Sequence, residues 1–335
     1  MSIKRGKRKH KTIEYGRYGY FFIAPFFIVY AIFHLWPLIN TIWMSFMEYY
    51  AKGLKVVGPN FNGFKNYVNV LFGEGELFNT FTFRTLGNTI IMWVANFIPQ
   101  ILLSLLLAAW FTDTRVKLRG VGFFKVSMYL PNIITAASLA VLFFSLFSIN
   151  GPMTQLLRQI GLIGETYDIM DNKWATRLII SFINFWMWYG NTMIILIAGI
   201  LGINPNLFEA ARIDGASSSQ IFRNITLPLL KPITLFVLVT SSIGGLQMFD
   251  IPSLFNVNQA GDGLPDYASN TITMYIRKLT LASKDYGRAG ASSVILFLVT
   301  LCISLVFFFF LSDRKELKEL DERVAIKKKR GMSNV

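Results

Sequence analysis

The stretch EAARIDGASSSQIFRNITLPLLKP, residues 209–232, lies between two of the most apolar segments of the chain. It is nevertheless charged, through Glu209, Arg212, Asp214 and Arg223, and it contains a run of three serines. A polar segment between two apolar segments of membrane length is expected to lie at a membrane surface. Its local signals decide whether it is a plain connector or an ordered surface.

Several of these signals mark the ends of helices. Asn204 followed by Pro205 is typical of an N-cap and the first helical position. Gly215 is expected to end this first helix with a positive φ. Ser217, with Gln220 three residues later, is a capping-box pattern that begins a second helix. The sequence therefore predicts two short helices joined by a tight turn.

Each arm of this predicted hairpin, residues 204–226, has a short apolar face, and that of the second arm extends into the next span. Six residues form the two faces: Leu207, Phe208 and Ala211 on the first arm, and Phe222, Ile225 and Leu229 on the second. A solvated connector needs neither caps nor apolar faces, whereas a surface that docks on another protein needs both. The pattern favours a docking surface.

The rest of the chain is that of a membrane protein. Of its 335 residues, 53% are hydrophobic and 15% aromatic, and the mean hydropathy is +0.46, which is too apolar for an ordinary soluble domain. Six runs are long enough to cross a bilayer as helices: residues 20–46, 87–111, 121–148, 174–201, 227–249 and 290–311. Prolines in or beside four of them indicate kinked packing or a bundle that bends and opens.

The distribution of basic residues predicts the orientation of these spans. An even number of spans puts both termini on one side of the membrane. The two terminal segments and the loops 112–120 and 202–226 together contain 20 Lys and Arg, whereas the three longer loops on the other side contain 10. Basic residues are enriched in cytoplasmic segments, so both termini and the hairpin are expected to be cytoplasmic.

The remaining composition excludes several classes of function. The net charge of +14 is explained by this orientation, and no aromatic-basic module for nucleic acid accompanies it. Cys302 is alone, and His10 and His34 have no ligand partners at metal spacing, so no metal site is implied. The sequence contains no phosphate-binding G-x-x-x-x-G-K-[ST] loop and no catalytic cluster. ATP hydrolysis would have to come from another protein.

The hairpin resembles the EAA motif of ABC-importer permeases, and the rest of the chain resembles the MalF-like carbohydrate branch. Ten motif positions match: Glu209, Ala210, Ala211, Asp214, Gly215, Ala216, Phe222, Ile225, Leu227 and Pro228. APFFIVYAIFHLWPLINTIWMSF, LPNIITAASLAVLFFSLF and GGLQMFDIPSLF are similar to other spans of that branch. NQAGDGLPDYASN, residues 258–270, departs from the Gly-Gly-Pro turn that the family often has, so this external loop is expected to differ in shape.

The resemblance implies an all-α polytopic membrane protein with six transmembrane helices, the MetI-like permease fold and a cytoplasmic coupling hairpin. It implies a second permease subunit, two ATPase subunits that bind the ATP, and an extracytoplasmic solute-binding protein. Dissimilar long loops favour a heterodimer of permeases. The residues that couple to the ATPase would be Glu209, Ala210, Ala211, Asp214, Gly215 and Ala216. No cofactor is expected in this chain, and its location would be the bacterial cell membrane.

The solute is expected to pass near the bilayer midplane, where interrupted helices offer polar groups. Asn184, Trp188 and Asn191 recur on one face of the fourth span. The other candidates follow a proline or a glycine pair: Asn132, Gln247 and Asp250. Aromatic residues at span ends also form interfacial belts, and an Asn can simply bond a neighbouring helix, so these alternatives stay open. Asp250 can equally be a helix-end residue at the outer interface.

These neutral to acidic candidates favour a neutral sugar, of disaccharide or oligosaccharide size, over an anionic solute. A glycerol-phosphate permease of the same branch is the alternative, whereas amino-acid and phosphate permeases tend to lack the long loop 48–86. A membrane enzyme lacks its catalytic cluster, and the hairpin argues against an exporter or a scaffold. The expected domains are a basic N-terminus (1–19), the permease domain (20–312, with the hairpin at 204–226) and a charged tail (313–335).

Overall fold

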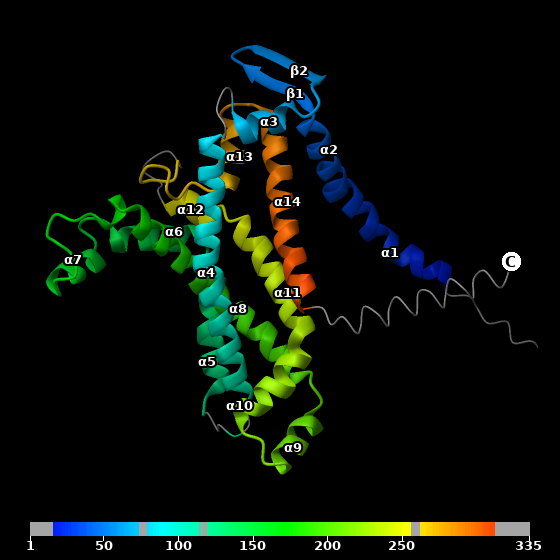
Figure 1. Cartoon of the computed structure of the whole chain (residues 1–335), viewed down its shortest axis with the longest axis vertical. Helices are drawn as coiled ribbons and strands as arrows, with labels where there is room; N and C mark the ends of the chain where they lie inside the picture. The colour runs from blue at the N-terminus through cyan, green and yellow to red at the C-terminus, as the bar shows by residue number, and fades with distance from the viewer. Residues whose placement is uncertain (1–15, 74–78, 114, 116–118, 256–261, 312–335) are drawn as a thin grey trace, which may run out of the picture.

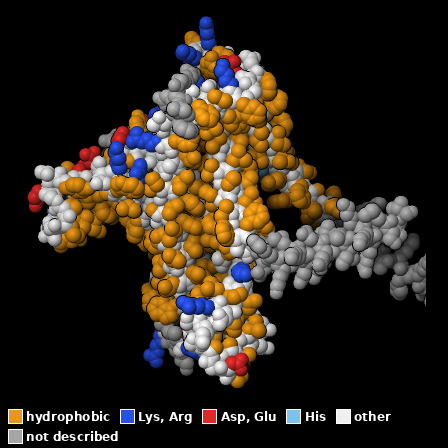
Figure 2. Space-filling model, in the orientation of Figure 1, with side chains coloured by type: hydrophobic (Ala, Val, Ile, Leu, Met, Phe, Trp, Pro, Cys, Tyr) orange, Lys and Arg blue, Asp and Glu red, His pale blue; other side chains and the backbone are white. Residues whose placement is uncertain are grey.

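The computed structural model describes residues 16–73, 79–113, 115, 119–255 and 262–311. Within these residues it has six helical segments that are long and apolar enough to cross a membrane: Gly19–Ser45, Thr80–Thr112, Ala136–Gln159, Lys173–Leu201, Ser218–Phe255 and Tyr286–Leu311. Hydrophobic side chains cover the middle of the face in Figure 2. The six-helix expectation is confirmed. The expected tail, and all but the last residues of the expected N-terminus, lie outside the described residues.

The centre of the bundle is the pair formed by α4 (Thr80–Thr112) and α8 (Lys173–Leu201), which run side by side over much of their length (Figure 1). Polar side chains join them: Ser104 Oγ donates to the carbonyl of Tyr189 at 2.7 Å, and Ser181 Oγ to that of Met92 at 3.2 Å. Small polar residues let membrane helices approach closely and bond across the interface. α4 therefore places the buried side chains of Asn88, Gln100 and Ser104 against α8.

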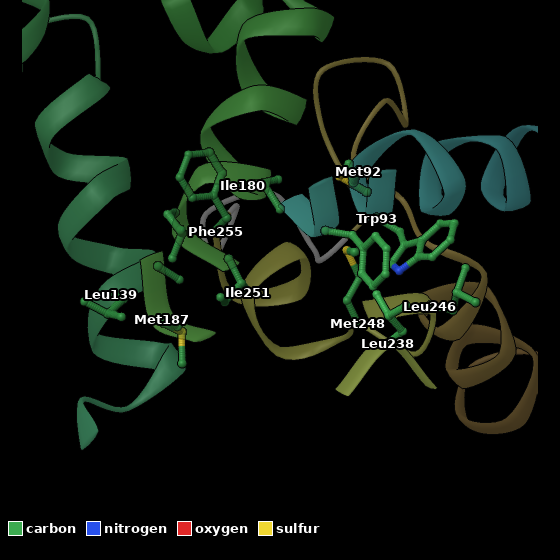
Figure 3. Close-up of a cluster of buried hydrophobic side chains, with 13 residues drawn as sticks. Met92, Trp93, Leu139, Ile180, Met187, Leu238, Leu246, Met248, Ile251 and Phe255 are labelled. Carbon is green, nitrogen blue, oxygen red and sulfur yellow. The ribbon is translucent and has the colours of Figure 1, made fainter. Parts of the chain in front are cut away.

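A hydrophobic cluster fills the outer half of this bundle (Figure 3). It is built by residues from α4, α6, α8, α11 and the segment after it: Met92, Trp93, Leu139, Ile180, Met187, Leu238, Leu246, Met248, Ile251 and Phe255. A second cluster, with Leu107, Met193 and Leu230, joins α4, α8 and α11 further towards the hairpin. These clusters fix the helices that surround the site described below.

The sequence predicted the third span as one run over 121–148, but the structure breaks this run into α5 (Val121–Tyr129), a 3-10 turn (Leu130–Ile133) and α6 (Ala136–Phe147). The segment that is long and apolar enough to cross a membrane begins only after the break, at Ala136, and extends to Gln159. Pro131 has no backbone N–H to donate, and Thr135 begins α6 by accepting from the Ser138 N–H at 3.3 Å. The chain then continues through α7 (Pro152–Gln159) and a 3-10 turn (Ile169–Asp171).

The second arm of the hairpin and the fifth span form one helical segment. It contains α10 (Ser218–Ile221), a π-helical turn (Phe222–Thr226) and α11 (Leu227–Leu246), after which α12 (Asp250–Phe255) follows. A π turn adds a residue and shifts the helix register. Ile221, Thr226 and Leu230 are therefore buried, whereas Leu229, expected on the apolar face, is half-exposed.

The first and last spans meet only near their outer ends. The first span comprises α1 (Gly16–Tyr30), a π-helical turn (Ala31–Leu35) and α2 (Trp36–Ser45), and α1 points away from the bundle (Figure 1). The last comprises α14 (Tyr286–Leu311), preceded by α13 (Ile272–Leu281). A Cβ at Gly290 would lie 3.0 Å from the Ser45 backbone nitrogen, so this glycine permits the close contact of α2 with α14.

The end of the molecule opposite the hairpin has an element that the all-α expectation missed. Strands β1 (Met47–Lys52) and β2 (Lys55–Phe61) form an antiparallel hairpin, with Met47 opposite Phe61, and α3 (Lys65–Phe72) follows it. In Figure 1 this unit and α13 lie at one end, and α9 and α10 at the other. The alternation of the loops therefore agrees with the expected arrangement of the spans.

Candidate functional site

The hairpin has the local structure that its sequence predicts. Asn204 Oδ1 accepts from the Asn206 N–H at 3.1 Å and begins α9 (Pro205–Ile213). Gly215 has a φ of +78°, which ends the helix in a conformation that other residues rarely adopt. Ser217 and Gln220 form both bonds of the capping box, at 2.7 and 3.3 Å. The turn is therefore fixed by its own residues.

The two sides of α9 differ. Phe208 and Arg212 turn inward, whereas Leu207, Glu209 and Ile213 are exposed, Ile213 to 87%. Ala210, Asp214 and Gly215 are exposed too, while Ala211 and Ala216 are half-buried. Among the residues that the structure describes, no ion pair of Glu209 is found. The outward side thus combines exposed apolar side chains with a free carboxylate, as a docking surface does.

The loop between α4 and α5 supports this hairpin. Arg115 donates from its guanidinium to the backbone carbonyl of Ala216 at 2.7 Å, directly after the glycine turn. Beneath α9, a groove of about 620 Å³ is bounded by Trp110 from α4, Ile200 from α8, and Phe208 and Phe222 from the hairpin. The sequence placed Arg115 only in a short basic loop, because nothing local shows that the loop reaches the turn.

A polar pocket of about 180 Å³ lies between α4, α8 and α11. Three of the expected solute-path residues line it together: Asn184, Trp188 and Asn191. Trp188 is 47% exposed, so its ring is available to a ligand. The spacing of these residues along the helix was sufficient to predict that they share a face, and the structure adds what lies opposite them.

The opposite wall comes from residues that the sequence reading missed. They are Asn96 and Gln100 on α4, Thr192 on α8, and Thr240, Ser241, Gly244 and Gly245 on α11. Gln100 Nε2 donates to Thr192 Oγ1 at 2.8 Å and to Ser241 Oγ at 3.3 Å, and so joins all three helices. Asn96 and Gln100 stand one turn apart beside Pro99, and this pattern could have identified them.

The other three expected residues do not line this pocket. Asn132 Nδ2 donates to the Met187 carbonyl at 3.2 Å, which ties the broken third span to α8. Gln247 and Asp250 are exposed just beyond the end of α11. They belong to the break between α11, which ends at Leu246 directly after the glycine pair, and α12, which begins at Asp250.

The outer ends of α4 and α8 hold the loop that precedes α13. Arg177 donates to the Ala268 carbonyl at 2.9 Å and to Asn88 Oδ1 at 2.6 Å. The Asp266 carboxylate forms ion pairs with Lys173 at 2.5 Å and with Arg84 at 2.9 Å. The hydrogen bond from Lys173, and after it that from Arg84, hold the pKa of the Asp266 carboxyl below its ordinary value of 3.8. The described part of this unusual loop is therefore anchored to the central helix pair.

The comparison with protein families accounts for this combination of hairpin, pocket and spans. Residues 89–318 match the family described as "binding-protein-dependent transport system inner membrane component". The chain belongs to this family. This permease is therefore an inner-membrane component of a binding-protein-dependent transport system, and the resemblance inferred from the EAA motif is confirmed.

Similar proteins include several sugar permeases. The chain is 33% identical to the lactose transport system permease protein LacF of Rhizobium radiobacter, over 89% of this chain and 95% of LacF. It is 29% identical to the arabinooligosaccharides transport system permease protein AraP of Bacillus subtilis (strain 168), over 86% of each chain. The sn-glycerol-3-phosphate permease UgpA of Agrobacterium fabrum is also 29% identical, over 88% of this permease and 94% of UgpA.

Solved structures show the same fold. A chain of a bacterial ABC transporter involved in the import of the acidic polysaccharide alginate superposes with a TM-score of 0.68 at 25% identity. The match covers 90% of this permease and 97% of that chain. The expected permease fold is thus confirmed over nearly the whole chain.

Proposed function

We propose that this permease forms half of the membrane channel of an ATP-driven sugar importer, and that its solute is a neutral disaccharide or oligosaccharide. The observation that carries the proposal is the polar pocket. It offers amide and hydroxyl groups and a half-exposed indole ring, which are the groups that bind and stack on sugars. The lactose and arabinooligosaccharide permeases among its relatives support the same solute class.

UgpA keeps glycerol phosphate as the alternative solute. A phosphate group is usually held by Arg, Lys or a helix N-terminus. No Lys or Arg is among the residues that line the pocket in the described part of the chain. The lining therefore favours an uncharged solute.

The energy for transport enters through partner subunits. The complete importer in this proposal has a second, different permease, two ATPase subunits that bind the ATP, and an extracytoplasmic binding protein that delivers the solute. This chain itself hydrolyses no ATP and needs no cofactor. The exposed side of α9 docks on an ATPase subunit, with Glu209 next to a cation of that subunit and the small Ala210 permitting close approach.

One helical segment connects this contact to the pocket. From Ser218 to Gly244 the helix is roughly 40 Å long at 1.5 Å per residue. A movement of the docked hairpin is therefore transmitted to Ser241 and Gly244 in the pocket wall. Closure of the ATPase subunits would change the shape of the pocket in this way.

The function is tested by uptake into vesicles that contain the whole transporter. Radiolabelled lactose, an arabinooligosaccharide and glycerol 3-phosphate are offered, each with a binding protein that recognises it. The expected result is uptake of a sugar that requires both ATP and the binding protein. Uptake of glycerol phosphate alone would contradict the solute class, and uptake without ATP would contradict the importer.

The orientation is tested by thiol labelling in intact cells. In a Cys302→Ser background, Ile160→Cys should react with a membrane-impermeant reagent, because its loop is expected outside the cell. Ala325→Cys should react only after the membrane is opened, since both termini are proposed to be cytoplasmic. The reverse pattern would contradict this orientation.

A further inference from the structure

Trp93 on α4 has a buried polar group without a partner. The residue is 8% exposed, and among the described residues its indole Nε1 has no hydrogen-bond partner. Figure 3 shows Trp93 in the same buried hydrophobic cluster as Leu238, Leu246 and Met248, in apolar surroundings. A buried indole N–H usually finds an acceptor, because leaving it unpaired costs free energy. The unpaired N–H therefore suggests a second state of the transporter in which it donates a hydrogen bond.

The glycine turn at Gly244 and Gly245, which forms one wall of the polar pocket, lies between this indole and the pocket. A Cβ at Gly245 would lie 2.4 Å from Trp93 Cδ1 and 3.1 Å from Nε1, so the N–H edge of the ring packs directly on this glycine. Gly244 and Gly245 both line the pocket. On α4, Trp93 lies three residues before Asn96 and seven before Gln100, on the side that leads to the pocket.

This wall lies where the helical structure of α11 is expected to be weakest. Gly244 and Gly245 lie in the last turn of the helix, which ends at Leu246. Glycine lowers the stability of a helix, and last turns fray. The pocket, at about 180 Å³, is smaller than the roughly 300 Å³ at which ligand clefts begin. Displacement of the glycine turn would enlarge the pocket and expose the indole edge at once.

We propose that Trp93 is a hidden part of the solute site, whose indole N–H donates a hydrogen bond to a sugar hydroxyl when the turn at Gly244 and Gly245 moves aside. This inference rests on the proposed function. It adds a further residue of the second span to Asn96 and Gln100, beside those of the fourth and fifth spans. It also explains the glycine at position 245, since a side chain there would hold the indole and the helix apart.

The test uses the whole transporter and the labelled sugar that the wild type takes up best. Trp93→Phe should raise KM roughly fivefold, as expected for one lost neutral hydrogen bond, with a maximal rate close to that of the wild type. Trp36→Phe is the matched control, because Trp36 is 67% exposed on α2 and lies outside the pocket. Replacement of the indole at position 93 by a benzothiophene ring keeps the shape, lacks the N–H, and should give the same rise in KM.

Monodeoxy forms of the same sugar separate a direct bond from a packing effect. For one deoxy position, the Trp93→Phe and wild-type transporters should have equal KM values, because the hydroxyl that accepts the bond is already absent. A wild-type KM for the benzothiophene variant would overturn the proposal, as would an equal penalty for every deoxy sugar. If the wild type takes up no sugar at all, the proposed function fails, and Trp93 fails with it for that separate reason.

Discussion

The hairpin and the polar pocket are joined by one helical segment, but the internal hydrogen bonds that stabilise each region differ. The hairpin is closed by bonds between near neighbours, such as Ser217 with Gln220. The pocket is closed by Gln100, whose partners Thr192 and Ser241 are 92 and 141 residues away in the sequence. The capping bonds of the hairpin would move with it as a unit, whereas a relative movement of α4, α8 and α11 would break the bonds of Gln100.

This difference suits a transporter that receives its energy from a partner. A docking surface must transmit motion without deforming, and local caps give it that stiffness. A solute pocket must open and close, and long-range bonds between three separate helices allow it to do so. The predictions below test the two regions against each other, beginning with the largest expected effect.

Reversal of the charge on the outer side of α9 should have the largest effect. In Glu209→Lys the exposed carboxylate becomes a cation, so the proposed attraction to an ATPase subunit would turn into repulsion. Uptake should fall at least roughly tenfold, with the permease still present in the membrane. Glu165→Lys is the control, because Glu165 is equally exposed but lies in the loop after α7, far from the hairpin. Equal uptake by Glu209→Lys and Glu165→Lys would show that the outer side of α9 is an ordinary surface and not a docking surface.

Gln100→Leu tests the pocket in the same assay. It removes the amide that joins α4 to α8 and α11 and leaves Thr192 and Ser241 without this partner. KM should rise about tenfold, because buried polar groups are left unpaired in the solute path. ATP hydrolysis without the binding protein should not change, since the hairpin is intact. Gln159→Leu, at an exposed position on α7, is the control. An unchanged KM would place the solute path elsewhere.

Trp188→Ala and Gln247→Ala sharpen the boundaries of the pocket. Loss of the ring at Trp188 removes a stacking face, and KM should rise roughly fivefold. Gln247 is exposed beyond the end of α11 and does not line the pocket, so its removal should change KM less than twofold. The order of the two effects is decisive. A larger effect of Gln247→Ala would show that the solute binds at the break between α11 and α12.

The smallest effect is expected at the outer loop. Because its pKa is lowered in the folded protein, the Asp266 carboxylate contributes to stability above the ordinary value of 3.8, and this contribution is lost as the pH falls through the lowered pKa. Asp266→Ala should lower the melting temperature slightly, by an amount that is the same at pH 5.5 and pH 8. If the difference in melting temperature between the wild type and Asp266→Ala grows across this range, another group controls the stability of the loop.

The same contrast explains which parts of the site could be predicted from the sequence. Asn204, Gly215 and Ser217 could be assigned because caps and turns depend on residues within one or two helical turns. Asn184, Trp188 and Asn191 could be grouped because they lie on one helix. Nothing local shows that Gln100 faces Ser241, or that Arg115 reaches Ala216. The β-hairpin after α2 could not be predicted from hydropathy or charge, because its strands are only six and seven residues long.

The helices were predicted less exactly where their backbone is irregular. The run of apolar residues over 121–148 hides the break at Pro131, because the hydropathy of the segment does not change there. The π turn over Phe222–Thr226 moves the buried face by one residue, from Leu229 to Leu230. The break follows from Pro131, which has no backbone N–H to donate, and neither feature is contained in a regular helical period of 3.6 residues.

The central claim is that the shape of the hairpin turn passes the action of the ATPase subunits to the pocket. Gly215→Val tests it, because φ is +78° there and the added side chain has open space, so only the backbone is strained. Gly161→Val is the matched control, with a φ of +74° and equal space in the loop after α7. The measurement is ATP hydrolysis by the reconstituted transporter, with and without solute-loaded binding protein, together with uptake. The account predicts that Gly215→Val loses both the stimulation and the uptake while Gly161→Val keeps them. Wild-type stimulation and uptake in Gly215→Val would contradict it.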